Sequence, residues 1–194
     1  MSKLIVALGN PGKEYESTRH NIAWTAMEHL SFSSNFNWMK KFKGYYSHST
    51  ISGTKYFFLK PQTYMNLSGE SVCKLANFFK IELEDILVLH DEMDLEFGTI
   101  AFKQGGGLAG HNGLRSIADR MGGRDFKRLR LGIGRPVHGS DSNWVLSPFG
   151  PDERIHLDIY LDTIVEAIET YMKRGFSFAA SNFSRKSILP EKGV

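Results

Sequence analysis

Polar residues that could do acid–base chemistry gather in four short segments, each beside a predicted strand end or helix start. The segments are residues 9–12 with Tyr15 and His20, then residues 63–66, His90 with Asp91, and residues 110–113. Sites in α/β proteins form outside the carboxyl ends of the strands, where such segments meet. Each segment has an ordinary structural explanation by itself, because asparagines cap helices and glycines suit loops. The prediction of one site therefore depends on their combination.

His20 and Asp91 are the strongest candidates for a catalytic pair. A carboxylate fixes the tautomer of a histidine and stabilises its protonated form, so the pair could act as a general base toward water. Two alternatives remain open from these residues alone. His20 could be a structural histidine at a helix start. Asp91 could bind a divalent cation with Glu92 and Asp94, but no His-Glu-x-x-His motif or set of thiolates is present, and we predict no metal.

A covalent nucleophile is poorly supported. The sequence has no Gly-x-Ser-x-Gly motif, and its single cysteine, Cys73, adjoins the apolar face of a predicted helix, where we expect an unreactive thiol. Water remains as the nucleophile, and it suffices for an ester because an alkoxide leaves more readily than an amine.

The segment from Gly105 to Gly110 matches the Gly-x-Gly-x-x-Gly pattern of dinucleotide-binding loops. That pattern also needs an acidic residue at the end of the next strand to hold the ribose, and the predicted strand at 127–133 has none. We predict no cofactor and interpret the segment as a mobile hinge or a turn that approaches phosphate.

Basic residues concentrate in one part of a chain whose net charge is only +3. Between Lys103 and Arg135 there are eight bases and two acids, whereas residues 82–96 hold seven acids and no bases. A local positive excess suggests a polyanion partner. Pairing between the two stretches on a solvated surface explains it equally well.

Composition excludes several classes of protein. A chain of 194 residues, 41% hydrophobic and 23% charged, is typical of one globular domain. No apolar run approaches the roughly 20 residues of a membrane span, and the first apolar run stops at Gly9, too early for a signal peptide. One cysteine can form no disulfide within the chain, which suits a reducing compartment. We predict a cytoplasmic protein with no membrane partner.

Strands and helices alternate along the chain. Apolar runs bounded by turn residues predict strands at 3–8, 45–51, 55–60, 86–89, 99–103 and 127–133. Apolar positions at helical spacing predict helices at 19–32, at 67–80, from the glycine-rich segment through Met121, and at 152–174. Only residues 40–44 and 137–149 are predicted to be irregular. The pattern predicts an α/β fold, a single domain over residues 1–194 with a twisted mixed β-sheet flanked by helices.

Five motifs, in this order, resemble those of the bacterial peptidyl-tRNA hydrolases. They are Gly9-Asn10-Pro11-Gly12, Tyr15 with Thr18-Arg19-His20-Asn21, Met65-Asn66-Leu67-Ser68-Gly69, His90-Asp91-Glu92 and Gly110-His111-Asn112-Gly113-Leu114. The resemblance runs nearly from end to end and implies a monomeric, metal-free α/β esterase. Such an enzyme would hydrolyse the ester bond between peptide and tRNA and recycle tRNA from peptides that leave the ribosome early.

The resemblance also implies roles for single residues. The catalytic residues would be His20 as base, Asp91 as its orienting carboxylate, and Asn10. The residues that contact the peptide and the terminal nucleotide would be Tyr15, Met65, Asn66 and Asn112. Amide side chains suit that task because they offer donors and acceptors to a peptide backbone of any sequence, and one of them could stabilise an oxyanion. The clamp for the tRNA 5′-phosphate would be Lys103 and Arg130.

Two positions depart from the family pattern. Ala23 stands where the family usually has glycine, and the loop at 137–143 has no lysine, so it lacks the side chain that sometimes contacts phosphate there. Two hypotheses compete with the esterase. One is a non-catalytic RNA-binding module that uses the basic stretch, and the other is a nicotinamide-dependent oxidoreductase that uses the glycine-rich segment.

Overall fold

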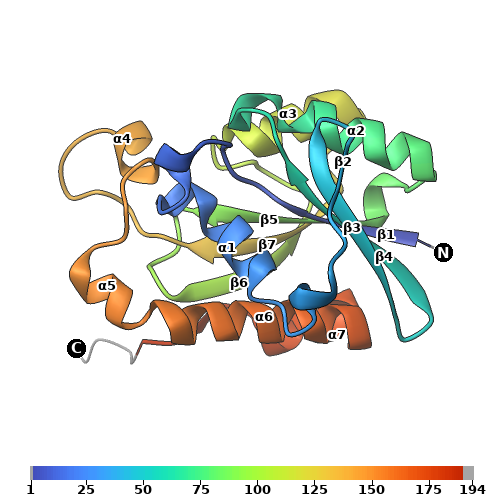
Figure 1. Cartoon of the computed structure of the whole chain (residues 1–194). Helices are drawn as coiled ribbons and strands as arrows, with labels where there is room; N and C mark the ends of the chain where they lie inside the picture. The colour runs from blue at the N-terminus through green and yellow to red at the C-terminus, as the bar shows by residue number, and fades with distance from the viewer. Residues whose placement is uncertain (1, 190–194) are drawn as a thin grey trace.

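A computed structural model describes residues 2–189, and in it eight strands form one mixed sheet with helices on both faces (Figure 1). The strands are β1 (Ser2–Ala7), β2 (Met39–Lys41), β3 (Gly44–Ile51), β4 (Thr54–Pro61), β5 (Ile86–Glu92), β6 (Thr99–Gln104), β7 (Lys127–Gly132) and β8 (Lys186–Ser187). The α-helices are α1 (Ile22–Glu28), α2 (Ser68–Phe79), α3 (Asn112–Met121), α4 (Asp141–Val145), α5 (Pro151–Ile155), α6 (Leu157–Arg174) and α7 (Phe176–Asn182). Short 3₁₀ helices are η1 (Lys13–Tyr15), η2 (Arg19–Asn21), η3 (Ser33–Asn35), η4 (Met65–Leu67) and η5 (Leu83–Asp85).

The predicted fold class, α/β with a mixed sheet flanked by helices, is confirmed. The single domain over residues 1–194 stays a prediction, and residue 1 and residues 190–194 lie outside the described residues. Within residues 2–189, no helix combines the length and the apolar character needed to cross a bilayer.

The sheet brings several chain segments to one edge. Its strand order is β2-β3-β4-β1-β5-β7-β6-β8, and the four strands β4, β1, β5 and β7 run parallel. Antiparallel strands complete both sides. Carboxyl ends of neighbouring parallel strands meet at the same edge. Asn10 follows β1, Met65 follows β4 and Asp91 lies near the end of β5, so three distant segments converge there.

The sheet has a separate apolar core on each face. Ile5 and Ala7 of β1 pack toward the layer of α1, α6 and α7, whereas Leu4 and Val6 pack toward α2 and α3. Side chains of a strand alternate between the two faces, so a central strand covered on both faces is apolar throughout. This burial explains the continuous apolar runs of β1 and β5 in the sequence.

One predicted helix is interrupted and another is shorter than predicted. The helix predicted at 152–174 is divided into α5 and α6 at His156, whose N–H bonds to Glu153 three residues back. The apolar spacing continues through this break, so hydropathy cannot locate it. The helix predicted at 19–32 is η2 followed by α1, and it ends at Glu28. Beyond it, Phe32 and Phe36 pack against Phe58 with ring centres 5.8 Å and 4.7 Å away, so tertiary packing ends the helix.

Several short elements were not predicted. Residues 40–44 include part of the edge strand β2, and residues 137–149 include α4. Near the carboxyl end, α7 and β8 were missed. Gly175 separates α6 from α7 with a φ of 84°, a conformation that favours glycine. Elements this short have too little periodicity to stand out in the sequence.

Candidate active site

A cleft of about 520 Å³ lies at the carboxyl edge of the parallel strands. It is lined by six of the residues predicted to form a site: Asn10, His20, Met65, Asn66, Asp91 and Asn112. Further lining residues include His111 and, from α4 and the loops beside it, Arg135, Asp141 and Leu146. The fold thus brings together side chains from β5, the loop after β1, and the 3₁₀ helices η2 and η4.

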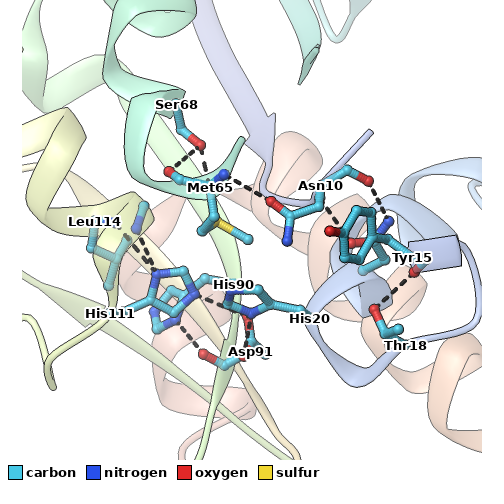
Figure 2. Close-up of polar contacts among 12 residues, drawn as sticks. Asn10, Tyr15, Thr18, His20, Met65, Ser68, His90, Asp91, His111 and Leu114 are labelled. Carbon is cyan, nitrogen blue, oxygen red and sulfur yellow. Dashed lines mark hydrogen bonds and ion pairs between the residues drawn. The ribbon is translucent and has the colours of Figure 1, made fainter. Parts of the chain in front are cut away.

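His20 and Asp91 form a hydrogen-bonded pair in this cleft. His20 Nδ1 lies 2.8 Å from Oδ1 and 2.9 Å from Oδ2 of Asp91, whose side chain is only 2% exposed (Figure 2). The other ring nitrogen, Nε2, makes no hydrogen bond within residues 2–189, and the histidine lines the cleft. One nitrogen is therefore held by the carboxylate while the other is left for a ligand.

The electrostatics of the pair favour a charged carboxylate beside a basic imidazole. Burial by itself would lower the pKa of His20, but the charge and hydrogen bond of Asp91 outweigh it, so the pKa of His20 is raised above 6.5. Burial would raise the pKa of Asp91, yet the two neighbouring histidines, His20 and His111, hold it well below its usual range. Asp91 is therefore ionised at neutral pH and stabilises a proton on His20.

Two further histidines surround Asp91. His111 Nε2 lies 2.9 Å from Asp91 Oδ1, the same oxygen that His20 contacts (Figure 2). His90 is fully buried, and its Nδ1 donates to the backbone carbonyl of Asp91 at 2.8 Å. Its ring meets that of His111 edge to face, with centres 5.2 Å apart. Burial holds the pKa of His90 well below its usual value, so this ring stays neutral.

Asn10 is fixed by three hydrogen bonds. Its N–H donates to Asn21 Oδ1 at 2.9 Å, and Asn21 Nδ2 donates back to its carbonyl at 2.9 Å. Its side-chain Oδ1 accepts the N–H of Met65 at 2.8 Å (Figure 2). Because these bonds occupy the carbonyl end of the side chain, the NH₂ end of Asn10 remains as a donor within the cleft.

Arg19, the residue before His20, holds the segment that follows α4. Its guanidinium donates to Ser147 Oγ at 2.6 Å and to the Pro148 carbonyl at 2.5 Å, and pairs with Glu153 at 2.5 Å. It also lies 3.5 Å from the ring centre of Trp144. The wall of the cleft formed by α4 is therefore attached to the same short helix, η2, that carries His20.

The carboxylates proposed as an alternative cation site are otherwise engaged. Glu92 pairs with Arg130 at 3.0 Å, and Asp94 pairs with Arg135 at 2.7 Å. A different triad, His20, Asp91 and His111, has ligand atoms within 4.8 Å of one another. In that triad the nitrogens are at hydrogen-bond distance from one carboxylate, and a metal on Nδ1 of His20 would leave the proton on Nε2. Metal binding there and base catalysis by His20 exclude each other.

The sequence of this chain is similar to the sequences of known enzymes along nearly its whole length. A family model described as peptidyl-tRNA hydrolase matches residues 4–191. The chain belongs to the peptidyl-tRNA hydrolase family. A peptidyl-tRNA hydrolase from Geotalea daltonii is 44% identical over 188 residues, covering 96% of this chain and 98% of the relative. One from Geobacter sulfurreducens is 42% identical over 189 residues, covering 97% of this chain and 98% of that protein.

Solved structures of peptidyl-tRNA hydrolases share the fold. The crystal structure of the enzyme from Acinetobacter baumannii has a TM-score of 0.84 and 36% identity, with 95% of each chain covered. A complex of peptidyl-tRNA hydrolase with N-propanol has a TM-score of 0.87 and 36% identity, with 96% of each chain covered. The chain is therefore an enzyme of this family, a hydrolase that acts on peptidyl-tRNA.

The glycine-rich segment does not form a dinucleotide-binding unit in this hydrolase fold. Such a unit needs two parallel strands joined through a helix. Here the segment follows β6, which is antiparallel to the next strand, β7. The oxidoreductase hypothesis therefore loses the context on which it depended.

The predicted phosphate clamp lies on the part of the sheet next to the cleft. Arg130 of β7 is in register with His90 of β5 and with Ala101 of β6, two residues before Lys103. Side chains two residues apart share a face of a strand, so Lys103 and Arg130 lie on one face. Lys103 is exposed, and Arg130 uses its Nε for Glu92. Their role in this hydrolase stays a prediction.

Four structural partners were not selected from the sequence: Arg19, Asn21, His90 and His111. Each belongs to a family motif, and His111 stands within the polar cluster at 110–113. The sequence could not show that Arg19 contacts the segment after α4 or that His111 contacts Asp91, because these contacts join segments that are distant in the chain. Tyr15, predicted to contact substrate, is half-buried and is not among the residues that line the cleft.

Proposed function

We propose that this protein hydrolyses the ester bond between the peptide and the 3′-terminal ribose of peptidyl-tRNA, with His20 as the general base. The observation that carries this mechanism is the pairing of His20 Nδ1 with buried Asp91, which leaves Nε2 for a water molecule in the cleft. Membership of the family supplies the substrate class, and the pair supplies the chemistry.

The reaction follows from the protonation states. Neutral His20 accepts a proton at Nε2 from water as the water oxygen attacks the ester carbonyl. Asp91 stabilises the resulting imidazolium without itself becoming protonated. When the tetrahedral intermediate collapses, the imidazolium returns the proton to the departing ribose oxygen. The products are a peptide with a free carboxyl group and tRNA with a free hydroxyl, and the histidine is neutral again.

Asn10 is the best-placed donor for the developing negative charge. Its Oδ1 is held by Met65, so the free NH₂ group has a fixed orientation. A donor that is oriented before the reaction stabilises an oxyanion more than one that must reorganise. Asn66 and Asn112, both exposed in the cleft, offer further donors and acceptors to the peptide backbone and the terminal nucleotide.

The phosphate clamp places the acceptor end of tRNA. Lys103 and Arg130 would hold the 5′-phosphate, since Arg130 makes no hydrogen bond besides that of its Nε within the described residues. In this proposal the protein acts as a monomer, without a cofactor, in the cytoplasm, and recycles tRNA from drop-off products. Tyr15 and Met65 contribute to substrate binding.

Turnover on a defined substrate tests the function. Purified protein is mixed with an excess of N-acetylated aminoacyl-tRNA, and free tRNA is counted per enzyme. The proposal predicts many turnovers and release of the intact acetylated amino acid. Binding of the tRNA without release would favour the RNA-binding module instead.

A further inference from the structure

His111 is the N-cap of α3, and its position defines which ring nitrogen carries the proton. Its Nδ1 accepts the N–H groups of Gly113 at 3.1 Å and Leu114 at 3.4 Å (Figure 2). A nitrogen that accepts two N–H groups must present a lone pair, so it carries no proton. The proton of the neutral ring therefore lies on Nε2.

The helix enforces this tautomer. A second proton on His111 would place a positive charge at the amino end of α3, where the free N–H groups already carry partial positive charge. It would also remove the acceptor from Gly113 and Leu114. The first turn cannot easily shift, because a Cβ at Gly113 would lie 2.6 Å from Met65 Sδ.

The remaining N–H of His111 meets Asp91. Nε2 donates to Asp91 Oδ1 at 2.9 Å, and the same oxygen is 2.8 Å from His20 Nδ1. The carboxylate is buried and so needs donors for its lone pairs. Two imidazole N–H groups supply them, one from the start of α3 and one from η2. The rings of His20 and His111 are neighbours, with centres 5.2 Å apart, and both contact this carboxylate.

We propose that His111 is a positioning residue for catalysis: α3 holds it in the neutral Nε2–H form, and that N–H orients Asp91 toward His20. This inference rests on the proposed function, because it assigns His111 a role in the action of His20. A neutral second donor has a specific advantage. It fixes the carboxylate without a competing positive charge, so the negative charge of Asp91 stabilises the imidazolium of His20 alone.

Other ionisable groups surround Asp91 and His111, and they come from several elements of the fold. They are His20 of η2, His90 and Glu92 of β5, Arg128 of β7, and Arg135 and Asp141 in the wall of the cleft. His90 stays neutral against the ring of His111, and Glu92, Arg135 and Asp141 are tied in ion pairs. Asp91 is the group that both His20 and His111 contact directly.

His111→Asn separates the two functions of the ring. Asparagine is a good N-cap and keeps an acceptor for the N–H groups of α3, but its shorter side chain cannot also reach Asp91. We expect kcat on a minimal peptidyl-nucleotide ester to fall by about 10-fold to 100-fold, the loss usual for a residue that orients a catalytic partner. KM should be nearly unchanged. Asp91 then has one hydrogen-bond donor fewer, so its negative charge acts more strongly on His20 and raises the pKa of His20 further. The acid limb of the pH–rate profile should therefore move to higher pH.

The matched control is Ala118→Gly, which weakens α3 through lost helix propensity far from its N-cap. It should lower the melting temperature and leave the pH midpoint in place. Histidine-labelled protein provides a second measurement by ¹⁵N NMR. The expected spectrum shows His111 Nδ1 unprotonated and Nε2 protonated across neutral pH.

The outcomes separate this inference from the proposed function. Wild-type kcat and pH midpoint in His111→Asn, or a protonated Nδ1 at neutral pH, would overturn the positioning role. If wild-type protein fails to cleave the ester, or if His20→Ala remains fully active, the proposed function fails instead. If His111→Asn unfolds, the NMR measurement on the wild-type protein still decides the tautomer.

Discussion

The guanidinium of Arg19 lies 3.5 Å from the ring centre of Trp144, and the same group pairs with Glu153. These contacts join η2, which carries His20, to the wall of the cleft and to α5. Arg19 has a side chain only 4% exposed, and burial lowers its pKa although Glu153 acts in the opposite direction. The stability of a buried guanidinium such as that of Arg19 depends on the groups that pair with it.

Arg19→Ala should therefore destabilise the protein by about 3 kcal/mol, since removing one partner of a buried pair leaves the other uncompensated. Urea denaturation measures this. Arg19→Lys keeps the charge but loses the planar fork that reaches several acceptors at once, so it should fall between wild type and Arg19→Ala. A loss below about 1 kcal/mol for Arg19→Ala, the value of a surface ion pair, would show that the contacts with Ser147, Pro148 and Glu153 contribute little.

The pH dependence of kcat/KM should report the raised pKa of His20. A general base must be neutral, so activity should rise with pH through a midpoint above 6.5, the ordinary value from which Asp91 raises it. Asp91→Asn removes that charge and leaves the effect of burial, which moves the midpoint below 6.5. Turnover at the optimum should fall by about 100-fold or more. An unchanged midpoint in Asp91→Asn would mean that another group controls the profile.

Most of the fold and much of the site were predictable from the sequence. Apolar runs located the central strands. The motifs after β1 and at the end of β5 located Asn10 and Asp91, because parallel strands end at one edge. The break at His156 escaped prediction since apolar spacing continues through it. The contacts of His111 with Asp91 and of Arg19 with Glu153 join residues 20 and 134 positions apart, and no local pattern encodes them.

Chelators should leave activity intact. Glu92 and Asp94 are paired with arginines, and His20 cannot be both a metal ligand through Nδ1 and a base through Nε2. Because magnesium also shapes tRNA, the measurement uses a minimal peptidyl-nucleotide ester with and without EDTA. Loss of activity that added Zn²⁺ or Mg²⁺ restores would contradict the metal-free mechanism and favour the triad of His20, Asp91 and His111 as a metal site.

Lys103→Ala and Arg130→Ala should lower activity on full-length peptidyl-tRNA but not on a minimal ester. Phosphate contacts supply affinity and position. Each variant should raise KM with little change in kcat and should flatten the dependence of log affinity on log salt by roughly 0.7 to 0.9 per phosphate lost. Lys173→Ala is the matched control, because Lys173 lies on α6, which covers the opposite face of the sheet. Equal losses on a minimal ester without an acceptor stem would mean that Lys103 and Arg130 support the fold.

Turnover of His20→Ala on the minimal ester tests the central claim most directly. The matched control is His29→Ala, an exposed histidine just beyond α1 whose ring contacts the Thr25 carbonyl. Circular dichroism confirms that both variants are folded. The account predicts that kcat falls by about two to four decades in His20→Ala, the range for a lost general base, and stays at the wild-type value in His29→Ala. Near-wild-type turnover by folded His20→Ala would contradict it.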